Sequence, residues 1–297
     1  MPLSSPVIVL LNAASGGTGP DEATIQARFL AAGIEAEIVV LQSGQDPGEA
    51  ARLVLDRAQI VVAAGGDGTV SGVAGALAGT SRILGVLPVG TLNHFAKDLA
   101  IPLDLEGAVA TIAGGRVASV DVGQVHDRVF VNNASIGVYP SIVEAREELR
   151  RAGHGKWPAM LLAVVRMLRS YRGVLVRMTV EGKEAQWRTP FVFVGNNEYT
   201  VEGLRLGSRR AVDGGRLFAY LAPRIHAYQL PLLAMRALLG LSAVSEAFEI
   251  VSAAELRVDA PHHRHIALAL DGELTRLTTP LDFRTWAGAL RVLVPPV

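Results

Sequence analysis

A glycine-rich segment with one carboxylate follows an apolar run in the first third of the chain. Residues 60–64 are apolar, and Gly65-Gly66-Asp67-Gly68-Thr69 comes directly after them. Glycines let the backbone approach a polyphosphate and point successive N–H groups at it, while Thr69 adds a hydroxyl donor where a helix would begin. The segment predicts a nucleotide phosphate site. A plain strand-to-helix turn is the alternative, because short glycine motifs carry a real false-positive risk.

Two other loops of small and polar residues also follow strand-like runs. Residues 7–11 lead into the loop 12–17, and residues 83–87 lead into the loop 88–93. Loops that leave the carboxyl ends of parallel strands converge on the ligand crevice of an open sheet. We therefore expect one shared phosphate-binding crevice, with these candidate ligands: Asn12, Ser15, Gly16, Gly17, Gly65, Gly66, Asp67, Gly68, Thr69, Thr91 and Asn93.

A late pair of carboxylates could perform acid–base chemistry. Asp271-Gly272-Glu273 follows the strand-like run 265–270, and an aspartate there could receive the proton of a hydroxyl acceptor. The competing interpretation is a hairpin turn, because Asp-Gly is a favoured turn dipeptide. Position in the sequence alone favours the turn.

Taken in order, these four segments resemble the motifs of the diacylglycerol kinase catalytic-domain family of lipid kinases, and the resemblance spans nearly the whole chain. It implies transfer of phosphate from ATP to a hydroxyl of diacylglycerol or a similar lipid, with Mg²⁺ as cofactor. Asp271 is then the implied general base, and Glu273 orients neighbouring groups or binds ligand. Asp67 is the rival base, since the related sphingosine kinases give that task to the aspartate of this glycine loop.

The resemblance also implies a magnesium-linked network that includes Asp67 and Asp121. The family's third aspartate, directly after the asparagine of the third loop, is replaced here by His94. An imidazole does not supply the anionic oxygen that Mg²⁺ prefers, so the network is rebuilt or ATP phosphates hold most of the metal. Asp98 could substitute, although a solvated helix position is favoured. Asp213 is a further metal candidate, with a simple turn favoured.

The pattern of apolar residues predicts two domains. Strands over 7–11, 35–41, 60–64 and 83–87 alternate with helices over 23–32, 48–57, 71–78 and 105–113, which indicates a doubly wound α/β sheet. Strand-like alternation follows at 129–135, 174–180, 189–194, 217–222, 247–251, 255–258, 266–270 and 289–294, which indicates an antiparallel, β-sandwich-like domain. We expect an ATP-binding domain over 1–121 and a β-rich lipid-binding domain over 122–297. The active site would lie in the cleft between them, and a return of the extreme C-terminal segment to pack on the first domain is left open.

Composition suits a cytoplasmic enzyme, and the resemblance implies that this enzyme meets the membrane peripherally when it acts on its lipid. The 28 lysine and arginine residues balance 28 aspartate and glutamate residues, so no net charge favours nucleic acid. The chain has no cysteine, which excludes disulfides and thiolate chemistry. No secretory signal is expected, and the apolar window 230–241 is too short to span a membrane. A homodimer remains open.

Two segments leave alternatives open. Residues 146–172 mix basic and apolar side chains, which would suit a membrane-touching surface, although helices packed on the core are slightly favoured. The cluster His262-His263-Arg264-His265 resembles a metal site, but an exposed hairpin loop is favoured.

Two other functions compete with a lipid kinase. An NAD kinase-like enzyme would share the glycine segment at residues 65–69, but the asparagine–glutamate pair usual at a nicotinamide site does not follow the third loop. A nucleotide-binding regulator without turnover is the non-enzymatic alternative. It is motivated by His94, which replaces the family's third aspartate, and by the segment around Gly44, which lacks the threonine that family members usually place before the helix start.

Overall fold

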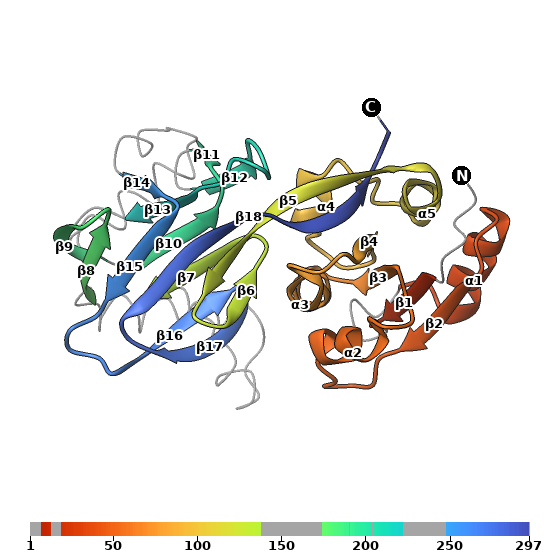
Figure 1. Ribbon diagram of the computed structural model, residues 1–297, viewed down its shortest axis with the longest axis horizontal. Helices are drawn as coiled ribbons and strands as arrows, with labels where there is room; N and C mark the ends of the chain where they lie inside the picture. Colours follow the sequence, from red (N-terminus) through yellow and green to blue (C-terminus); the bar gives the residue numbers. More distant parts are fainter. Residues whose placement is uncertain are drawn as a thin grey trace, which may run out of the picture.

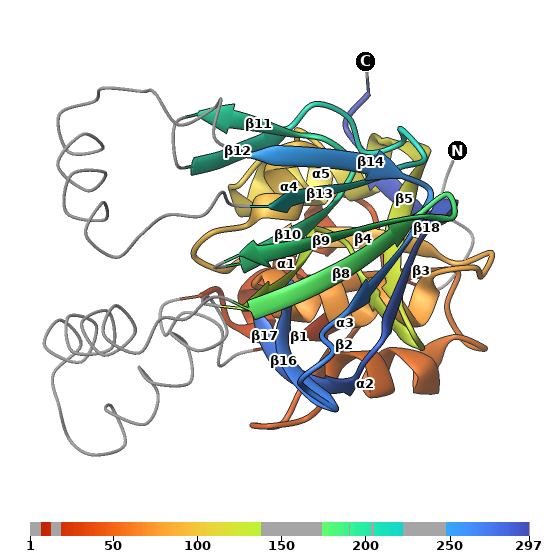
Figure 2. The ribbon, with the colours of Figure 1, turned by 90° about the vertical axis from the view of Figure 1, so that its left-hand side faces the viewer.

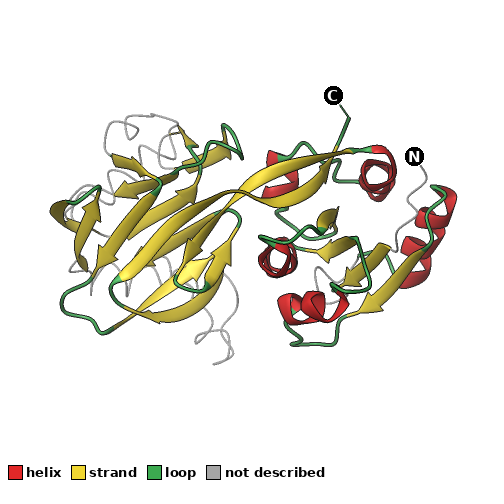
Figure 3. Cartoon of the chain, in the orientation of Figure 1, coloured by secondary structure: helices red, strands yellow, loops and turns green. Residues whose placement is uncertain are grey.

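The computed structural model describes residues 7–12, 19–137, 174–189, 191–202, 205–221 and 248–296. Every helix in these ranges belongs to the N-terminal part of the chain, and the remainder is built from strands (Figure 3). Among the described helices, none has the length and apolar content to cross a membrane. The predicted segments at 146–172 and 230–241 fall outside the described residues.

The N-terminal part alternates strands and helices. Its elements are β1 (Val7–Leu11), α1 (Glu22–Ala31), β2 (Ala36–Val40), α2 (Pro47–Val54), β3 (Ile60–Gly65), α3 (Asp67–Leu77), β4 (Ile83–Pro88), α4 (His94–Asp98) and α5 (Leu105–Gly114). The residues of β1, β3 and β4 are all buried, as expected for parallel strands covered on both faces.

The order of the parallel strands decides where helices lie. The strands run β2-β1-β3-β4, so the chain moves outward from β1 to β2 and then returns across β1 to β3 and β4. Right-handed crossovers place α1 on one face of the sheet and α2 and α3 on the other. Contacts of α1 with α5 and of α2 with α3 agree with this arrangement (Figure 1). The direction reverses between β1 and β3, where open α/β sheets bind ligands.

The rest of the chain forms antiparallel strands. These are β5 (Arg116–Val125), β6 (Arg128–Phe130), β7 (Asn133–Gly137), β8 (Val174–Val180), β9 (Lys183–Thr189), β10 (Phe191–Asn196), β11 (Tyr199–Glu202), β12 (Arg205–Arg209), β13 (Leu217–Leu221), β14 (Glu249–Ala253), β15 (Glu255–Asp259), β16 (His265–Leu270), β17 (Glu273–Thr278) and β18 (Leu281–Val294). One sheet has the order β14-β13-β10-β7-β16-β17, and β11 with β12 forms a separate hairpin (Figure 2).

Two long strands connect the α/β part to the β-rich part. Strand β18 pairs in parallel with β4 near its C-terminal end and antiparallel with β15 near its start. Strand β5 pairs antiparallel with β18 over most of its length, so both ribbons cross between the two parts (Figure 1). Separate clusters of buried apolar residues lie on the two sides of this crossing. The cleft between the parts is therefore bridged by a continuous sheet.

The fold class predicted from sequence is confirmed, and several boundaries are corrected. The last strand spans 14 residues from Leu281, because its first half pairs with β15 and not with the N-terminal sheet. The predicted strand 129–135 is divided into β6 and β7, since residues 131 and 132 turn their N–H groups to another partner. Helix α3 begins at Asp67 and not at residue 71. The histidine cluster is exposed, with residues 262–264 in the turn between β15 and β16 and His265 at the start of β16, which agrees with the favoured hairpin loop.

Candidate active site

Asn12, the glycine segment 65–69 and the loop 88–93 meet at the carboxyl ends of the parallel strands. Asn12, directly after β1, donates its backbone N–H to the Ala64 carbonyl at 2.9 Å, and its Nδ2 donates to Thr69 Oγ1 at 3.0 Å. The backbone of the third loop reaches the same place, because a Cβ added to Gly90 would lie 2.3 Å from Gly66 Cα. The described parts of the loops therefore share one crevice at the switch between β1 and β3.

The glycines of this crevice differ in how much room their neighbours leave for a side chain. A Cβ on Gly65 would meet the Thr69 side chain at 2.4 Å, and a Cβ on Gly68 would meet Glu273 Oε1 at 2.5 Å. Gly66 differs, because its Cβ would have only an ordinary contact of 3.6 Å with Gly90 Cα. Space above Gly66 is thus open toward the crevice.

The first turn of α3 is the best candidate for the phosphate cradle. Gly66 is the N-cap of α3 and supplies no capping side chain. In contrast, α2 is capped by Asp46, whose carboxylate accepts from the N–H of Gly48 at 2.7 Å and of Glu49 at 3.2 Å. Helix N-termini whose N–H groups lack side-chain partners attract anions. The start of α3 can therefore accept a phosphate, whereas the start of α2 is already occupied by a carboxylate.

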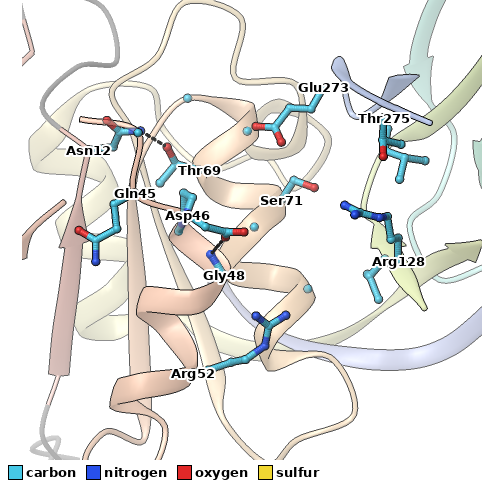
Figure 4. A pocket seen from close by; sticks show the side chains of 18 of the residues that line it. Asn12, Gln45, Asp46, Gly48, Arg52, Thr69, Ser71, Arg128, Glu273 and Thr275 are labelled. Carbon is cyan, nitrogen blue, oxygen red and sulfur yellow. Dashed lines mark hydrogen bonds between the residues drawn. The ribbon is translucent and has the colours of Figure 1, made fainter. Parts of the chain in front are cut away.

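A cavity of about 800 Å³ opens over this helix start (Figure 4). Residues of α2 and α3 form one side, and residues of β6 and β17 form the other. Arg52 on α2 and Arg128 on β6 point into the cavity from opposite sides (Figure 4). The volume is in the range of small-molecule sites, and the two guanidinium groups suit phosphate oxygens.

Asp271 is held by four hydrogen-bond donors. Its Oδ2 accepts from Ser71 Oγ at 2.5 Å and from the Val131 N–H at 2.8 Å. Its Oδ1 accepts from the N–H groups of Asn132 at 2.8 Å and Asn133 at 2.9 Å. Asp271 and Gly272 also form the two-residue turn between β16 and β17, with φ values of 47° and 90°. The turn is the means by which the carboxylate reaches α3 and the loop between β6 and β7.

Burial and charge affect the two carboxyl groups of this turn differently. Burial raises the pKa of Asp271, while the hydrogen bonds from Ser71 and from the three backbone N–H groups lower it without cancelling the burial effect. For Glu273, loss of solvent contact raises the pKa, and the negative charges of Asp271 and Asp46 raise it further. A carboxylate with a raised pKa is well suited to accept a proton.

A second cavity of about 600 Å³ borders the same two segments. Gly66, Gly68 and Glu273 line the first cavity, whereas Asp67 and Asp271 line the second. Aromatic and aliphatic side chains contribute to the second cavity, namely Leu92, Phe191, Phe193 and Tyr199. Because adjacent residues of the same two segments line both cavities, a group bound in one would lie next to a group bound in the other.

The predicted metal residues do not gather at one point. Asp67 is partly exposed at the start of α3, and within the described residues its carboxylate has one hydrogen bond, a long one of 3.5 Å from the Phe95 N–H of α4. Asp121 is 2% exposed, and its carboxylate accepts from Asn197 Nδ2, the Gly215 N–H and the Gly288 N–H. It lines neither cavity.

Other candidate positions have separate environments. Asp213 is exposed in the turn before β13, and His94 lines the second cavity with Asp67. The described residues contain no group of three histidine, aspartate or glutamate side chains arranged to hold a metal. Asp67 is thus the one of these candidates that fits a magnesium ion held largely by phosphate oxygens and water.

The remaining predicted ligands are placed as follows. Ser15, Gly16 and Gly17 lie outside the described residues. Thr91 is exposed, and Asn93 Nδ2 donates to the carbonyls of Pro88 and Gly90, so this amide shapes its own loop.

The expected solvated position of Asp98 is wrong. Its side chain is 7% exposed and pairs with the buried guanidinium of Arg209, with 2.7 Å between Nε and Oδ2. The pairing depends on β12 folding back onto α4, which no local pattern of residues 94–98 indicates.

Sequence reasoning missed several residues that the structure brings to the site. Arg52, Arg128 and Ser71 line the first cavity. The backbone of residues 131–133 surrounds Asp271, and Arg209 lies behind that loop. Among these residues, Arg52 on α2 was the one that its basic side chain could have indicated from the sequence. Backbone N–H donors cannot be recognised in a sequence, because every residue except proline has one.

Comparison with protein families agrees with the two-part architecture. Residues 6–125 match the diacylglycerol kinase catalytic domain. Residues 135–294 match the YegS C-terminal NAD kinase beta sandwich-like domain.

Relatives and solved structures point the same way. The Cronobacter sakazakii protein named "Probable lipid kinase YegS-like" is 31% identical over 271 residues, which cover 84% of each chain. A Staphylococcus aureus protein named "Diacylglycerol kinase" is 31% identical over 149 residues, covering 50% of this chain and 47% of the relative. A crystal structure of a diacylglycerol kinase from Bacillus anthracis str. Sterne has a TM-score of 0.69 at 18% identity, covering 98% of this chain and 96% of that one. At such identity the structural likeness concerns the fold.

Proposed function

This chain belongs to the lipid kinase family that joins a diacylglycerol kinase catalytic domain to a YegS-type C-terminal domain, and we propose that it transfers the γ-phosphate of ATP to a hydroxyl of diacylglycerol or a similar lipid. The observation that carries this proposal is the position of Asp271, which lines the second cavity while its neighbours Leu270 and Glu273 line the first. The first cavity suits a polyphosphate, and the second suits the hydroxyl-bearing end of a lipid.

The triphosphate would lie over the start of α3. The N–H groups of the first turn face its oxygens, and Arg52 and Arg128 neutralise charge from the two sides of the cavity. The same cavity also contains Asp46 and Glu273. Their carboxyl groups disfavour a bare polyphosphate, so the bound nucleotide needs additional positive charge.

Asp67 would hold a divalent cation on this nucleotide. This residue is partly exposed, and a single carboxylate combined with phosphate oxygens and water is a common way to bind Mg²⁺. When bound, Mg²⁺ would neutralise part of the charge on the β- and γ-phosphates.

Asp271 would act as the general base. The acceptor oxygen forms a bond to the γ-phosphorus, the bond from that phosphorus to the bridging oxygen of ADP breaks, and the hydroxyl proton passes to the Asp271 carboxylate. Ser71 and the N–H groups of residues 131–133 orient this carboxylate. Phosphoryl transfer has a loose transition state, so orientation and charge account for most of the rate increase.

The acceptor would enter from a membrane surface through the second cavity. Phe191, Phe193 and Tyr199 offer apolar contacts next to the polar groups of Asn132 and Asn133. Acyl chains would use the apolar part, and a glycerol-like hydroxyl would meet Asp271. The reaction would then take place at the cytoplasmic face of a membrane by peripheral contact.

The test is phosphate transfer from ATP to a lipid mixture. The purified protein is incubated with ATP, Mg²⁺, NAD and detergent-dispersed lipids of several classes, and mass spectrometry identifies each species that gains a phosphate. We expect a lipid with a free hydroxyl to gain the phosphate and the Asp271→Asn variant to form little product. Phosphorylated NAD without a phosphorylated lipid would contradict the proposal and favour the NAD kinase alternative.

A further inference from the structure

A buried arginine lies directly behind the loop that surrounds Asp271. The side chain of Arg209, the last residue of β12, is 0% exposed, and its Nε donates to Asp98 Oδ2 at 2.7 Å. Its guanidinium also lies 5.7 Å from the ring centroid of Phe95. Asp98 and Phe95 belong to α4, so this arginine connects the N-terminal part with the β-rich part. A buried charge of this kind needs good hydrogen-bond geometry to offset its lost hydration.

The remaining donors of Arg209 hold the loop between β6 and β7. Its Nη1 donates to the Val131 carbonyl at 2.5 Å, and its Nη2 donates to Asn132 Oδ1 at 3.1 Å. Asn196 Nδ2 donates to the same Val131 carbonyl at 3.0 Å, and the Tyr199 hydroxyl donates to the Asn132 carbonyl at 3.1 Å. Two successive peptide carbonyls of the loop therefore have side-chain donors.

The same two peptide groups face Asp271 with their N–H groups. The peptide whose carbonyl accepts from Arg209 donates the Asn132 N–H to Asp271 Oδ1 at 2.8 Å. The peptide whose carbonyl accepts from Tyr199 donates the Asn133 N–H to Oδ1 at 2.9 Å. A donor on a carbonyl polarises the amide and strengthens its N–H as a donor. Arg209 thus polarises the peptide group whose N–H donates to the Asp271 carboxylate.

We propose that Arg209 is a positioning residue for phosphoryl transfer, which acts through residues 131–133 to orient the Asp271 carboxylate. The inference rests on the proposed function, in which Asp271 receives the acceptor proton. Burial already raises the pKa of Asp271 against the hydrogen bonds that lower it, so a weaker set of N–H donors should raise this pKa further. When the pH is lowered, a variant with this weaker set of donors would then lose turnover at a higher pH than the wild type.

Other charged groups near Asp271 must stay unchanged in the test. They are Asp67, His94, Lys97 and Asp98 in the second cavity, and Glu273 in the next strand. The Arg209→Lys variant leaves all of them in place and keeps a cation for Asp98. A lysine cannot reproduce the planar fork that contacts Asp98 and both loop acceptors together.

The first measurement is the pH dependence of lipid phosphorylation. We expect Arg209→Lys to lower kcat on the order of ten- to hundred-fold, with KM for ATP nearly unchanged, and to move the acidic limb of the profile to higher pH. Arg210→Lys is the matched control, because the neighbouring Arg210 side chain is 65% exposed and pairs with Glu198. The control should leave the profile as in the wild type.

The second measurement does not depend on activity. Amide chemical shifts of residues 131–133 are followed by NMR as pH changes, because these N–H groups report the charge of Asp271 directly. The midpoint should rise in Arg209→Lys and rise less in Tyr199→Phe, which removes one donor while keeping the aromatic ring. The same spectra show whether each variant is folded.

The outcomes separate this inference from the proposed function. The inference would be overturned if a folded Arg209→Lys variant kept both the wild-type NMR midpoint of Asp271 and the wild-type acidic limb of the pH profile of lipid phosphorylation. This holds even if Asp271→Asn is inactive. Normal turnover in Asp271→Asn would instead overturn the assignment of the base, and the NMR midpoint would still decide whether Arg209 controls the carboxylate.

Discussion

At the scale of single residues, Asp271 is both a turn residue and a carboxylate that accepts hydrogen bonds from four donors. Its positive φ fits the hairpin interpretation, and its four donors fit a residue held for chemistry. The two interpretations do not exclude each other, because the tight turn projects the carboxylate out of the sheet toward α3. Asp67 differs, since within the described residues its carboxylate has one long hydrogen bond, which suits the proposed role in holding a cation.

We predict that Asp271→Asn lowers turnover by roughly 10²–10⁴-fold with ATP affinity nearly unchanged, because the amide cannot accept the proton. Calorimetric ATP binding and lipid phosphorylation measure the two quantities. In the wild type, the raised pKa of Asp271 should place the acidic loss of turnover above the ordinary aspartate value of about 3.9.

The contrast with Asp67→Asn decides between the two candidate bases. That variant should require more Mg²⁺ for half-maximal activity, because it loses the charge that helps to hold the cation. Asp56→Asn, which changes an exposed carboxylate after α2, is the control. If Asp271→Asn retains turnover while Asp67→Asn binds ATP without reacting, Asp67 is the base.

At the scale of elements, helix α3 starts at a glycine and, like the short α4, has no side-chain capping hydrogen bond within the described residues. Helices α1, α2 and α5 are capped by aspartates, whereas α3 starts at a glycine beside the cavity. Its unoccupied N–H groups and the arginines of α2 and β6 surround the same volume. Local backbone geometry and long-range packing together create the proposed phosphate site.

We predict that Gly66→Val abolishes ATP binding while the protein stays folded. The added Cβ has only one ordinary contact, so the branched side chain should fill the cradle without displacing its neighbours. Calorimetry measures binding, and circular dichroism measures folding. Gly114→Ala is the control, because its Cβ meets no atom within 4 Å. Wild-type ATP affinity in folded Gly66→Val would remove this turn from the site.

We also predict that Arg128→Gln weakens ATP binding about ten-fold, which is the effect of losing one charge-assisted hydrogen bond. Arg57→Gln provides the control, since Arg57 pairs with Glu37 at the exposed surface and lines neither cavity. Equal effects of the two substitutions would show that general charge, and not the position of Arg128, determines affinity.

At the scale of the whole molecule, strands β5 and β18 make the two parts one continuous structure. They carry the main chain across the cleft, while Arg209 provides a side-chain connection from α4 to β12 and the Asp271 loop. Next to this connection, Tyr199 and Tyr220 form a buried pair. The Tyr199 N–H donates to Tyr220 Oη at 2.8 Å, and the Tyr220 hydroxyl donates to the Tyr199 carbonyl at 3.2 Å.

This tyrosine pair predicts loss of stability at alkaline pH. Burial raises the pKa of both Tyr199 and Tyr220, so the folded state keeps their protons after the unfolded chain has lost them. The free energy of unfolding should therefore fall as pH rises above about 10, by at most about 1.4 kcal/mol per pH unit for each tyrosine. Denaturant titrations from pH 8 to 11 measure it. Tyr199→Phe should show a shallower fall, and an unchanged slope would contradict this explanation.

The sequence by itself determined the α/β start, the β-rich remainder and the glycine segment that faces the crevice. These features depend on local physics: runs of apolar residues form covered parallel strands, and glycine permits close backbone approach. The main local error was the predicted start of α3 at residue 71. The helix starts at Asp67, because Gly66 serves as its N-cap without a capping side chain.

Only the tertiary structure decided what surrounds each carboxylate. The donors to Asp271 lie 138 to 200 positions earlier in the chain, and three of them are backbone N–H groups that any residue except proline could supply. The Arg209–Asp98 pair spans 111 positions. Identical aspartates at positions 67, 98, 121 and 271 thus acquire different environments, because burial and hydrogen bonding are set by strand pairing between distant segments and leave no local pattern.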